Sequence, residues 1–191
     1  MVVTLLALHG SGRDETDLTT FAQQIAPQCR FLAPRGEFVD GAGFTFFRRL
    51  SDRIIPTAEV VALAKRWLSN HAPILPPEGE NPVVVGYSSG AIFAEALLAA
   101  CPDRWAGAVL LRPEPLAEGF VFPTAKDVPI LILAGRRDER RKADDAPLRA
   151  KQLEAAQAKV TLHILDAGHR WASGDEDAIM TRAWLAGVGM G

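Results

Sequence analysis

The chain has 191 residues, of which 48% are hydrophobic, and its 21 basic and 23 acidic side chains leave a formal net charge of −2. A globule of this length buries about 70% of the surface of its unfolded chain, so we expect one domain with one sizeable core. The near-neutral charge, with basic residues scattered along the chain, argues against a nucleic-acid binder and against a polybasic membrane-surface protein.

The longest apolar runs are far shorter than the roughly 20 residues that cross a bilayer, so we expect no membrane segment. No basic stretch precedes the apolar run at Val2–Leu8, which therefore lacks the pattern of a signal peptide. These features favour a cytoplasmic protein. Cys29 and Cys101 have no metal-ligand spacing and make no disulfide framework, so we expect free thiols, no metal and no cofactor.

Short β-branched runs alternate along the chain with longer segments of helical period. This alternation is typical of an α/β protein, in which a mostly parallel sheet is covered by helices on both faces as a three-layer sandwich. We predict about six strands, at Val2–Leu8, Arg30–Ala33, Val83–Val85, Gly107–Leu111, Pro129–Ala134 and Val160–Leu165. We predict helices around Leu18–Ile25, around Val60–Trp67 with Thr57 as N-cap, and at Ser89–Ala100, Pro147–Ala158 and Glu176–Leu185.

The segment Gly86-Tyr87-Ser88-Ser89-Gly90 follows a predicted strand and opens a predicted helix. A G-x-S-x-G pattern in this context is typical of a nucleophile elbow. The turn is so sharp that side chains in place of its glycines would collide, and Ser88 should adopt a positive φ that projects its hydroxyl from the sheet. Ser88 is therefore the candidate nucleophile, and the alternative is a turn with a structural serine.

A serine hydroxyl needs a histidine base, and the histidine needs an acid that holds it in one tautomer. Of the four histidines, His169 comes immediately after the last predicted strand, at the same edge of the sheet as Ser88. Asp138 follows the strand between those of Ser88 and His169, which gives the chain order Ser, Asp, His. The alternative acids are Asp144, Asp145 and Asp166.

An acyl-transfer site also needs donors for the negative charge that develops on the substrate oxygen. The turn His9-Gly10-Ser11-Gly12 ends the first predicted strand, and its glycines let backbone amides approach a ligand. We predict the amides of Ser11 and Ser89 as the two donors of an oxyanion hole.

Several further segments accompany these motifs: Leu8-His9-Gly10-Ser11-Gly12-Arg13-Asp14-Glu15, Ala33-Pro34-Arg35-Gly36, Phe46-Phe47-Arg48-Arg49, Leu110-Leu111-Arg112-Pro113 and Ala167-Gly168-His169. Together they resemble the α/β-hydrolase superfamily, and within it the small carboxylesterase/phospholipase (predicted esterase) family, near the acyl-protein thioesterases and dienelactone hydrolases. The resemblance spans nearly the whole chain. It implies an α/β-hydrolase fold with Ser88, Asp138 and His169 as catalytic triad and Ser11 and Ser89 as oxyanion donors.

The resemblance also predicts a truncated sheet. In the superfamily an antiparallel pair of strands precedes the strand that leads to the oxyanion turn, whereas here that strand starts at residue 2, so we expect the pair to be missing. The strand at Arg30–Ala33 would then be an exposed edge. Because an exposed edge invites pairing, we expect a homodimer through this region.

Apolar residues near the predicted site are candidates for substrate binding, namely Phe44, Phe46, Phe47 and Trp171, with core packing as the alternative role. No long lid insertion is visible, so we expect an open site for small soluble esters. Candidates for binding an anionic acyl or leaving group are Arg48, Arg49 and Arg112, with salt bridging at the surface as the more ordinary role.

These observations predict a carboxylesterase that works through an acyl-enzyme on Ser88, with a small-molecule ester as its partner. The alternatives are a thioesterase, a lysophospholipase or a dienelactone-type hydrolase, and a catalytically silent ligand-binding protein on the same fold. The presence of a nucleophile, a base, an acid and both oxyanion positions favours an enzyme.

Overall fold

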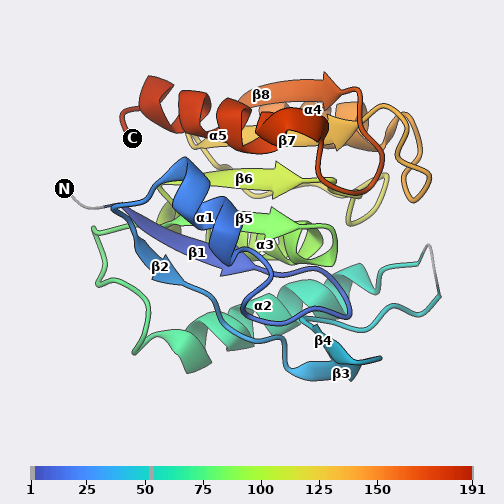
Figure 1. Ribbon diagram of the computed structural model, residues 1–191. Helices are drawn as coiled ribbons and strands as arrows, with labels where there is room; N and C mark the ends of the chain where they lie inside the picture. Colours follow the sequence, from blue (N-terminus) through green and yellow to red (C-terminus); the bar gives the residue numbers. More distant parts are fainter. Residues whose placement is uncertain (1–2, 52–53, 191) are drawn as a thin grey trace.

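The computed structural model describes residues 3–51 and 54–190, and within them six parallel strands form one sheet in the order β2-β1-β5-β6-β7-β8 (Figure 1). Each strand is parallel to its neighbours. This arrangement confirms the predicted fold class. The strands are β1 (Thr4–Leu8), β2 (Arg30–Leu32), β5 (Val83–Tyr87), β6 (Gly107–Leu111), β7 (Pro129–Gly135) and β8 (Lys159–Leu165). Val2, the predicted start of the first strand, lies outside the described residues.

Helices cover both faces of the sheet, as the alternating pattern predicts. They are α1 (Thr19–Ile25), α2 (Thr57–His71), α3 (Ser89–Ala100), α4 (Asp145–Ala155) and α5 (Glu176–Gly187). The structure places α1 and α5 together on one face and α2, α3 and α4 on the other (Figure 1). The helix predicted at Pro147–Ala158 is shifted in the structure. It begins at Asp145 and ends at Ala155, and residues 156–158 form the turn that leads to β8.

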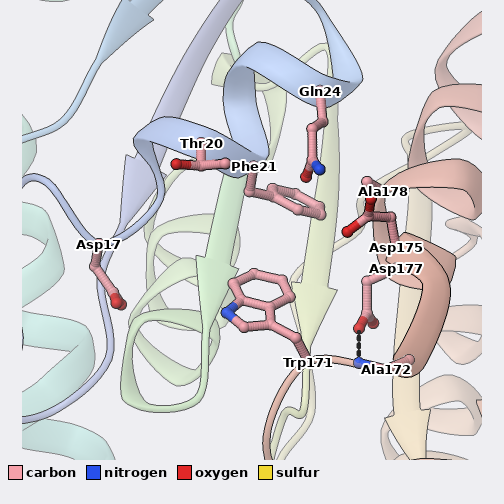
Figure 2. A pocket seen from close by; sticks show the side chains of 9 residues that line it. All are labelled: Asp17, Thr20, Phe21, Gln24, Trp171, Ala172, Asp175, Asp177 and Ala178. Carbon is pink, nitrogen blue, oxygen red and sulfur yellow. Dashed lines mark hydrogen bonds between the residues drawn. The ribbon is translucent and has the colours of Figure 1, made fainter.

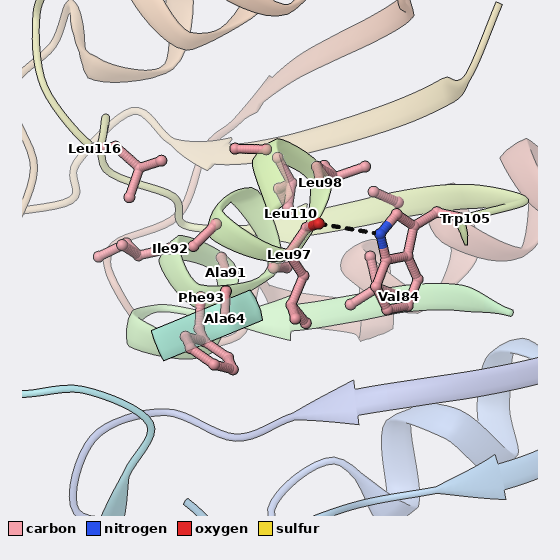
Figure 3. Packing of buried hydrophobic residues seen from close by; sticks show 14 of the residues in the cluster. Ala64, Val84, Ala91, Ile92, Phe93, Leu97, Leu98, Trp105, Leu110 and Leu116 are labelled. Atoms are coloured by element: carbon pink, nitrogen blue, oxygen red, sulfur yellow. Dashed lines mark hydrogen bonds between the residues drawn. The ribbon is translucent and has the colours of Figure 1, made fainter. Parts of the chain in front are cut away.

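Alternate residues of each central strand belong to two different cores. Leu6 and Leu8 pack under α2 and α3, whereas Leu5 and Ala7 pack under α1 and α5. The larger core contains the side chains of α3, which is buried from Ser89 to Ala99 (Figure 3). The helix that carries the residues after the candidate nucleophile is therefore held mainly by apolar packing.

Two local features differ from the prediction. A two-stranded antiparallel hairpin, β3 (Phe38–Asp40) and β4 (Gly43–Thr45), lies apart from the main sheet and was not predicted. Thr57 was expected to cap α2, but Pro56 holds the cap position and Thr57 Oγ1 donates to the carbonyl of Leu116 at 2.6 Å. The start of α2 therefore has no side-chain cap hydrogen bond. Across the described residues, no helix is both long and apolar enough to cross a membrane.

Candidate active site

The turn between β5 and α3 has the strained geometry expected of a nucleophile elbow. Ser88 has φ 54° and ψ −113°, a conformation that L residues rarely adopt. A Cβ on Gly86 would overlap the backbone of Gly90, and a Cβ on Gly90 would overlap the carbonyl of Leu8 in β1. Both glycines are therefore required by backbone contacts, the second by a neighbouring strand rather than by the turn itself.

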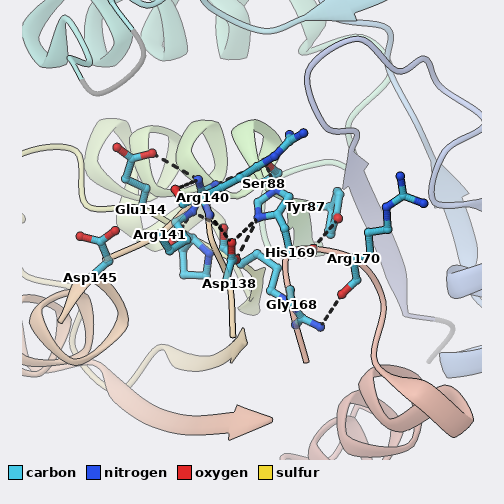
Figure 4. A network of polar contacts seen from close by, with 12 residues as sticks. Tyr87, Ser88, Glu114, Asp138, Arg140, Arg141, Asp145, Gly168, His169 and Arg170 are labelled. Carbon is cyan, nitrogen blue, oxygen red and sulfur yellow. Dashed lines mark hydrogen bonds and ion pairs between the residues drawn. The ribbon is translucent and has the colours of Figure 1, made fainter. Parts of the chain in front are cut away.

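The structure brings Ser88, His169 and Asp138 into one chain of hydrogen bonds at the carboxyl edge of the sheet (Figure 4). His169 Nε2 lies 2.9 Å from Ser88 Oγ, and His169 Nδ1 lies 2.9 and 3.0 Å from the two oxygens of Asp138. The aspartate is an acceptor, so Nδ1 carries a proton and Nε2 is left to accept the proton of the serine. This tautomer is the one that a general base requires.

The environment of Asp138 keeps its carboxylate charged. Burial disfavours the charge, but hydrogen bonds from His169 and from the Arg140 amide at 2.9 Å outweigh burial and hold the pKa of Asp138 below its ordinary value. Of the alternative acids, Asp145 accepts the Lys142 amide, and Asp166 pairs with Arg137 at the surface. Asp138 is thus the carboxylate that contacts the His169 ring.

The loop that carries His169 is held by Tyr87, which the sequence reasoning did not assign to the site, and by Arg112, which it considered only for anion binding. Tyr87 donates its hydroxyl to the carbonyl of His169 at 2.7 Å. Arg112, at the end of β6, donates to the carbonyls of Gly168 and Arg170 at 3.2 and 3.1 Å. Both residues directly follow predicted strands or sit in the elbow motif, which is the signal that could have identified them.

Arg141 is a second residue that the sequence reasoning passed over. Its Nη2 donates to Ser88 Oγ at 3.3 Å, and its Nη1 lies 3.4 Å from the carboxylate of Glu114. Burial lowers the pKa of Arg141, while Glu114 and Asp138 oppose that effect. A guanidinium remains protonated in proteins, so the nucleophile has a fixed positive charge beside it.

The two predicted oxyanion donors lie next to the candidate nucleophile Ser88. Ser11, Ser88 and Ser89 line one cavity of about 430 Å³. In the described part of the chain, neither the Ser11 amide nor the Ser89 amide donates to any acceptor. Both are therefore available to a ligand oxygen, as an oxyanion hole requires.

His9 fixes the turn that contains Ser11. Its Nε2 accepts the amide of Gly36 at 2.9 Å, so its Nδ1 carries the proton and donates to the Gly10 carbonyl at 2.8 Å. The ring packs against Phe46 with centroids 4.7 Å apart. His9 is buried and has a structural place beside the candidate oxyanion hole.

The cavity at Ser88 is lined mainly by polar and charged side chains. Besides the three serines its walls are Arg49, Glu139, Arg140 and Arg141. Of the residues predicted to bind substrate, Phe46 lies in the core against Phe93, and Phe44 packs under the guanidinium of Arg35. Phe47 lines a neighbouring cavity of about 310 Å³ that also includes Ser11 and Arg49.

Trp171 faces a different cavity, of about 210 Å³, between α1 and the start of α5 (Figure 2). Its ring stacks between Phe21 and Tyr87, at centroid distances of 5.0 and 5.1 Å. None of the three serines at the nucleophile lines this cavity. The structure therefore does not bring Trp171 together with Phe44, Phe46 and Phe47, the other residues predicted to bind substrate.

The three arginines considered for anion binding have different surroundings. Arg112 is buried and pairs with Asp177 at 2.8 and 2.9 Å. Arg49 pairs with Glu114 at 2.8 Å and lines the cavity at Ser88. Arg48 lies over the ring of Phe38. The surface salt bridging expected of Arg112 is wrong, because its guanidinium is enclosed between β6, the His169 loop and α5.

A parallel sheet of this order, with a serine, a histidine and an aspartate joined at its carboxyl edge, defines the α/β-hydrolase class. The sequence profile of the Dienelactone hydrolase family matches residues 52–186, and the chain belongs to that family.

Solved structures and a sequence relative agree with this assignment. A carboxylesterase from Mesorhizobium loti is 31% identical, with a TM-score of 0.87 over 97% of this chain and 88% of that one. A Bacillus cereus carboxylesterase is 27% identical, with a TM-score of 0.87 over 98% and 89% of the two chains. MhqD of Bacillus subtilis (strain 168) is 28% identical over 183 residues, 94% of this chain and 90% of MhqD. The protein is a hydrolase of the dienelactone hydrolase and carboxylesterase type.

Proposed function

We propose that this protein is a serine carboxylesterase that cleaves small esters through an acyl-enzyme on Ser88. The observation that carries the proposal is the pair of contacts of His169, 2.9 Å from Ser88 Oγ on one side and 2.9 Å from Asp138 on the other. Three separate loops supply these groups, and core packing alone gives no reason for the alignment. Ser88 is the nucleophile, His169 the base and Asp138 the residue that orients the base.

In acylation, Ser88 Oγ attacks the ester carbonyl while its proton moves to His169 Nε2, and the carbonyl electron pair moves to the oxygen. In this mechanism the amides of Ser11 and Ser89, two residues that line the same cavity as Ser88, donate to this oxyanion. When the carbonyl re-forms, the bond to the alcohol breaks and the alcohol takes the proton from His169. Water then repeats the sequence on the acyl-enzyme and releases the carboxylic acid, and Ser88 recovers its proton.

The cavity at Ser88 supports short or polar acyl groups. Its charged walls offer little apolar surface to a long alkyl chain, so the burial of additional methylenes gains little free energy there. We expect kcat/KM for p-nitrophenyl esters to be highest for acetate and butyrate and to fall for chains of about ten carbons or more. The same panel should include a thioester and a lactone, because hydrolases of this family type could also cleave these bonds. Their kcat/KM values are then compared with those of the esters.

The decisive experiment compares wild type with Ser88→Ala. A fluorophosphonate probe should label wild type only, and the variant should lose about four to six orders of magnitude in p-nitrophenyl acetate turnover. Ser69→Ala, on the exposed face of α2, is the matched control and should match wild type in both assays. Folded wild type that is neither labelled nor active would contradict the proposal and favour a ligand-binding protein.

The base is tested separately with His169→Ala. Because no other histidine lines the cavities that contain Ser88, the variant should lose at least three orders of magnitude in kcat. If it keeps more than a tenth of wild-type turnover, His169 is not the base.

A further inference from the structure

A guanidinium contacts the reacting oxygen of the proposed nucleophile. Arg141 Nη2 donates to Ser88 Oγ at 3.3 Å, while the same oxygen lies 2.9 Å from His169 Nε2 (Figure 4). The arginine contact is long for a hydrogen bond in the resting protein. Contacts of this kind often tighten only when substrate is bound and charge develops.

Backbone and side-chain acceptors hold the rest of this guanidinium in place. Arg141 Nε donates to the carbonyls of Arg112 and Pro113 at 2.9 and 3.0 Å, and Nη1 donates to the Arg140 carbonyl at 3.0 Å. Glu114 lies 3.4 Å from Nη1. The Arg141 side chain is only 10% exposed. The remaining nitrogen, Nη2, is thereby aimed at Ser88 before any substrate arrives, which is the preorganisation that makes a donor effective.

We infer that Arg141 is a further catalytic residue, whose Nη2–H stabilises negative charge on Ser88 Oγ. This inference rests on the proposed function. Charge develops on that oxygen twice, when its proton leaves for His169 during attack and when the C–Oγ bond breaks during deacylation. In the second step the bonding pair returns to Oγ, which then takes a proton from His169. Arg141 supplies a hydrogen bond in both steps and keeps its own protons.

The surrounding charges allow a cation at this position. A positive charge beside the nucleophile opposes the formation of a protonated imidazole, but Asp138 contacts His169 directly and Glu114 lies against Arg141. Asp138 therefore faces the imidazole, and Glu114, which also pairs with Arg49, faces the guanidinium of Arg141. The hydrogen bond of Arg141 acts on the oxygen itself, where a donor stabilises developing charge most.

Arg141 also ties the loop of Asp138 to the end of β6, so a loss of activity on its replacement needs a chemical readout. Arg141→Met and Arg141→Gly should lose roughly 10- to 100-fold in kcat/KM, as expected for a hydrogen bond to a charged group. Arg141→Lys should recover only part of this, because a single ammonium cannot reach Ser88 and the backbone carbonyls together. Phosphonylation of Ser88 by the fluorophosphonate probe should slow in parallel.

Rescue by a small cation separates catalysis from structure. Methylguanidinium at millimolar concentration should restore a large part of the activity of Arg141→Gly, because the cavity beside Ser88 is open to it. Methylurea, which has a similar shape and no charge, should not restore it. Lys142→Gly is the matched control, since Lys142 is exposed in the same loop and does not line the cavities that contain Ser88, and it should show neither the loss nor the rescue.

Two outcomes would overturn the inference while leaving the proposed function intact. One is folded Arg141→Met with kcat/KM within threefold of wild type. The other is a loss in Arg141→Gly that methylguanidinium and methylurea restore equally or not at all, which would assign Arg141 a structural role. Failure of the proposed function would instead appear as turnover or probe labelling in Ser88→Ala.

Discussion

Arg112 joins the stability of the protein to the position of His169. It is 1% exposed, has a positive φ of 53°, and forms two hydrogen bonds to Asp177 at the start of α5. Asp177 also accepts the amide of Ala172 at 2.7 Å. Its other hydrogen bonds go to the carbonyl of Leu133 in β7 and to the two carbonyls on either side of His169. A buried pair with all these acceptors fixes the base relative to the sheet.

Replacement of Arg112 should therefore reduce both the free energy of unfolding and the ester turnover. Arg112→Met leaves Asp177 as a buried, unpaired charge and should reduce the free energy of unfolding by about 3–5 kcal/mol. The double variant Arg112→Met/Asp177→Leu removes that charge and should regain most of this stability. It should not regain activity, because the carbonyls of Gly168 and Arg170 still lack their donor. Urea unfolding and ester turnover measure the two effects, and full activity in the double variant would contradict a positioning role.

The positions of some side chains at the site can be predicted from the sequence, and the positions of others cannot. Ser88, Asp138 and His169 each follow a strand, so the topology of a parallel sheet brings them to one edge. Arg141 lies three residues beyond Asp138 within a run of mixed charges, where exposure was the natural expectation. Its burial depends on the carbonyls of another loop, and no local pattern reports such a contact.

Between elements, the contact that links α3 to α4 is a buried pair of a carboxyl and a guanidinium. Glu95 and Arg149 are both fully buried, with 2.9 Å between Oε2 and Nη2, and the guanidinium lies over the ring of Phe122 at 4.8 Å. Burial raises the pKa of Glu95 to about 8 against the opposing effect of Arg149. The helix that begins at the nucleophile is thus joined to its neighbour by a carboxyl that resists ionisation.

This raised pKa predicts how stability depends on pH. Between pH 4.5 and about 8, Glu95 keeps its proton when folded and loses it when unfolded, so its contribution to stability falls as pH rises. Glu95→Gln lacks this effect. The free energy of unfolding of the variant minus that of wild type should therefore increase by on the order of 1–3 kcal/mol from pH 5 to pH 8. Urea unfolding at four pH values measures the difference. Glu154→Gln, exposed on α4, controls for the loss of one carboxyl.

A difference between Glu95→Gln and wild type that stays constant over this pH range would mean that Glu95 is ionised in the folded protein. The pair with Arg149 would then be a full ion pair at neutral pH. The contribution of the pair to stability would then come from the attraction between two opposite charges and not from the neutral form of Glu95.

The β3–β4 hairpin is the element that the sequence analysis missed, although a local signal was present. Asp40 pairs with Gly43, so Gly41 and Ala42 form a two-residue loop, and a glycine with positive φ (+58° at Gly41) at the first loop position is typical of tight hairpin turns. Each strand has only three residues, too few to show a clear alternation of apolar and polar positions. The hairpin matters to the site because the Gly12 amide donates to the Phe44 carbonyl and the Phe44 amide donates to the Arg13 carbonyl.

For the molecule as a whole, the six strands could be located from the sequence because each is a short apolar run, and the resemblance implied the edge position of the second one. The parallel arrangement, the two helical layers and the position of β2 at the edge all agree with the expectation. The substrate cavity was harder to foresee, because its walls come from loops whose side chains are placed by long-range contacts. Phe46, expected at the substrate, is 1% exposed and packs in the core.

The open edge of β2 leads to a prediction about assembly. The Arg30 amide donates to Val3 in the direction of β1, so the neighbouring amide of Phe31 points to the open edge of the sheet. We expect two protomers to pair through this edge, and sedimentation at micromolar concentration should then show a dimer.

Hydrogen exchange at the Phe31 amide should be slower at micromolar than at nanomolar concentration. The Val160 amide, which faces outward from β8 at the opposite edge, should exchange at the same rate in both. A monomer at micromolar concentration would contradict the prediction, and protection at Val160 instead of Phe31 would move the interface to β8.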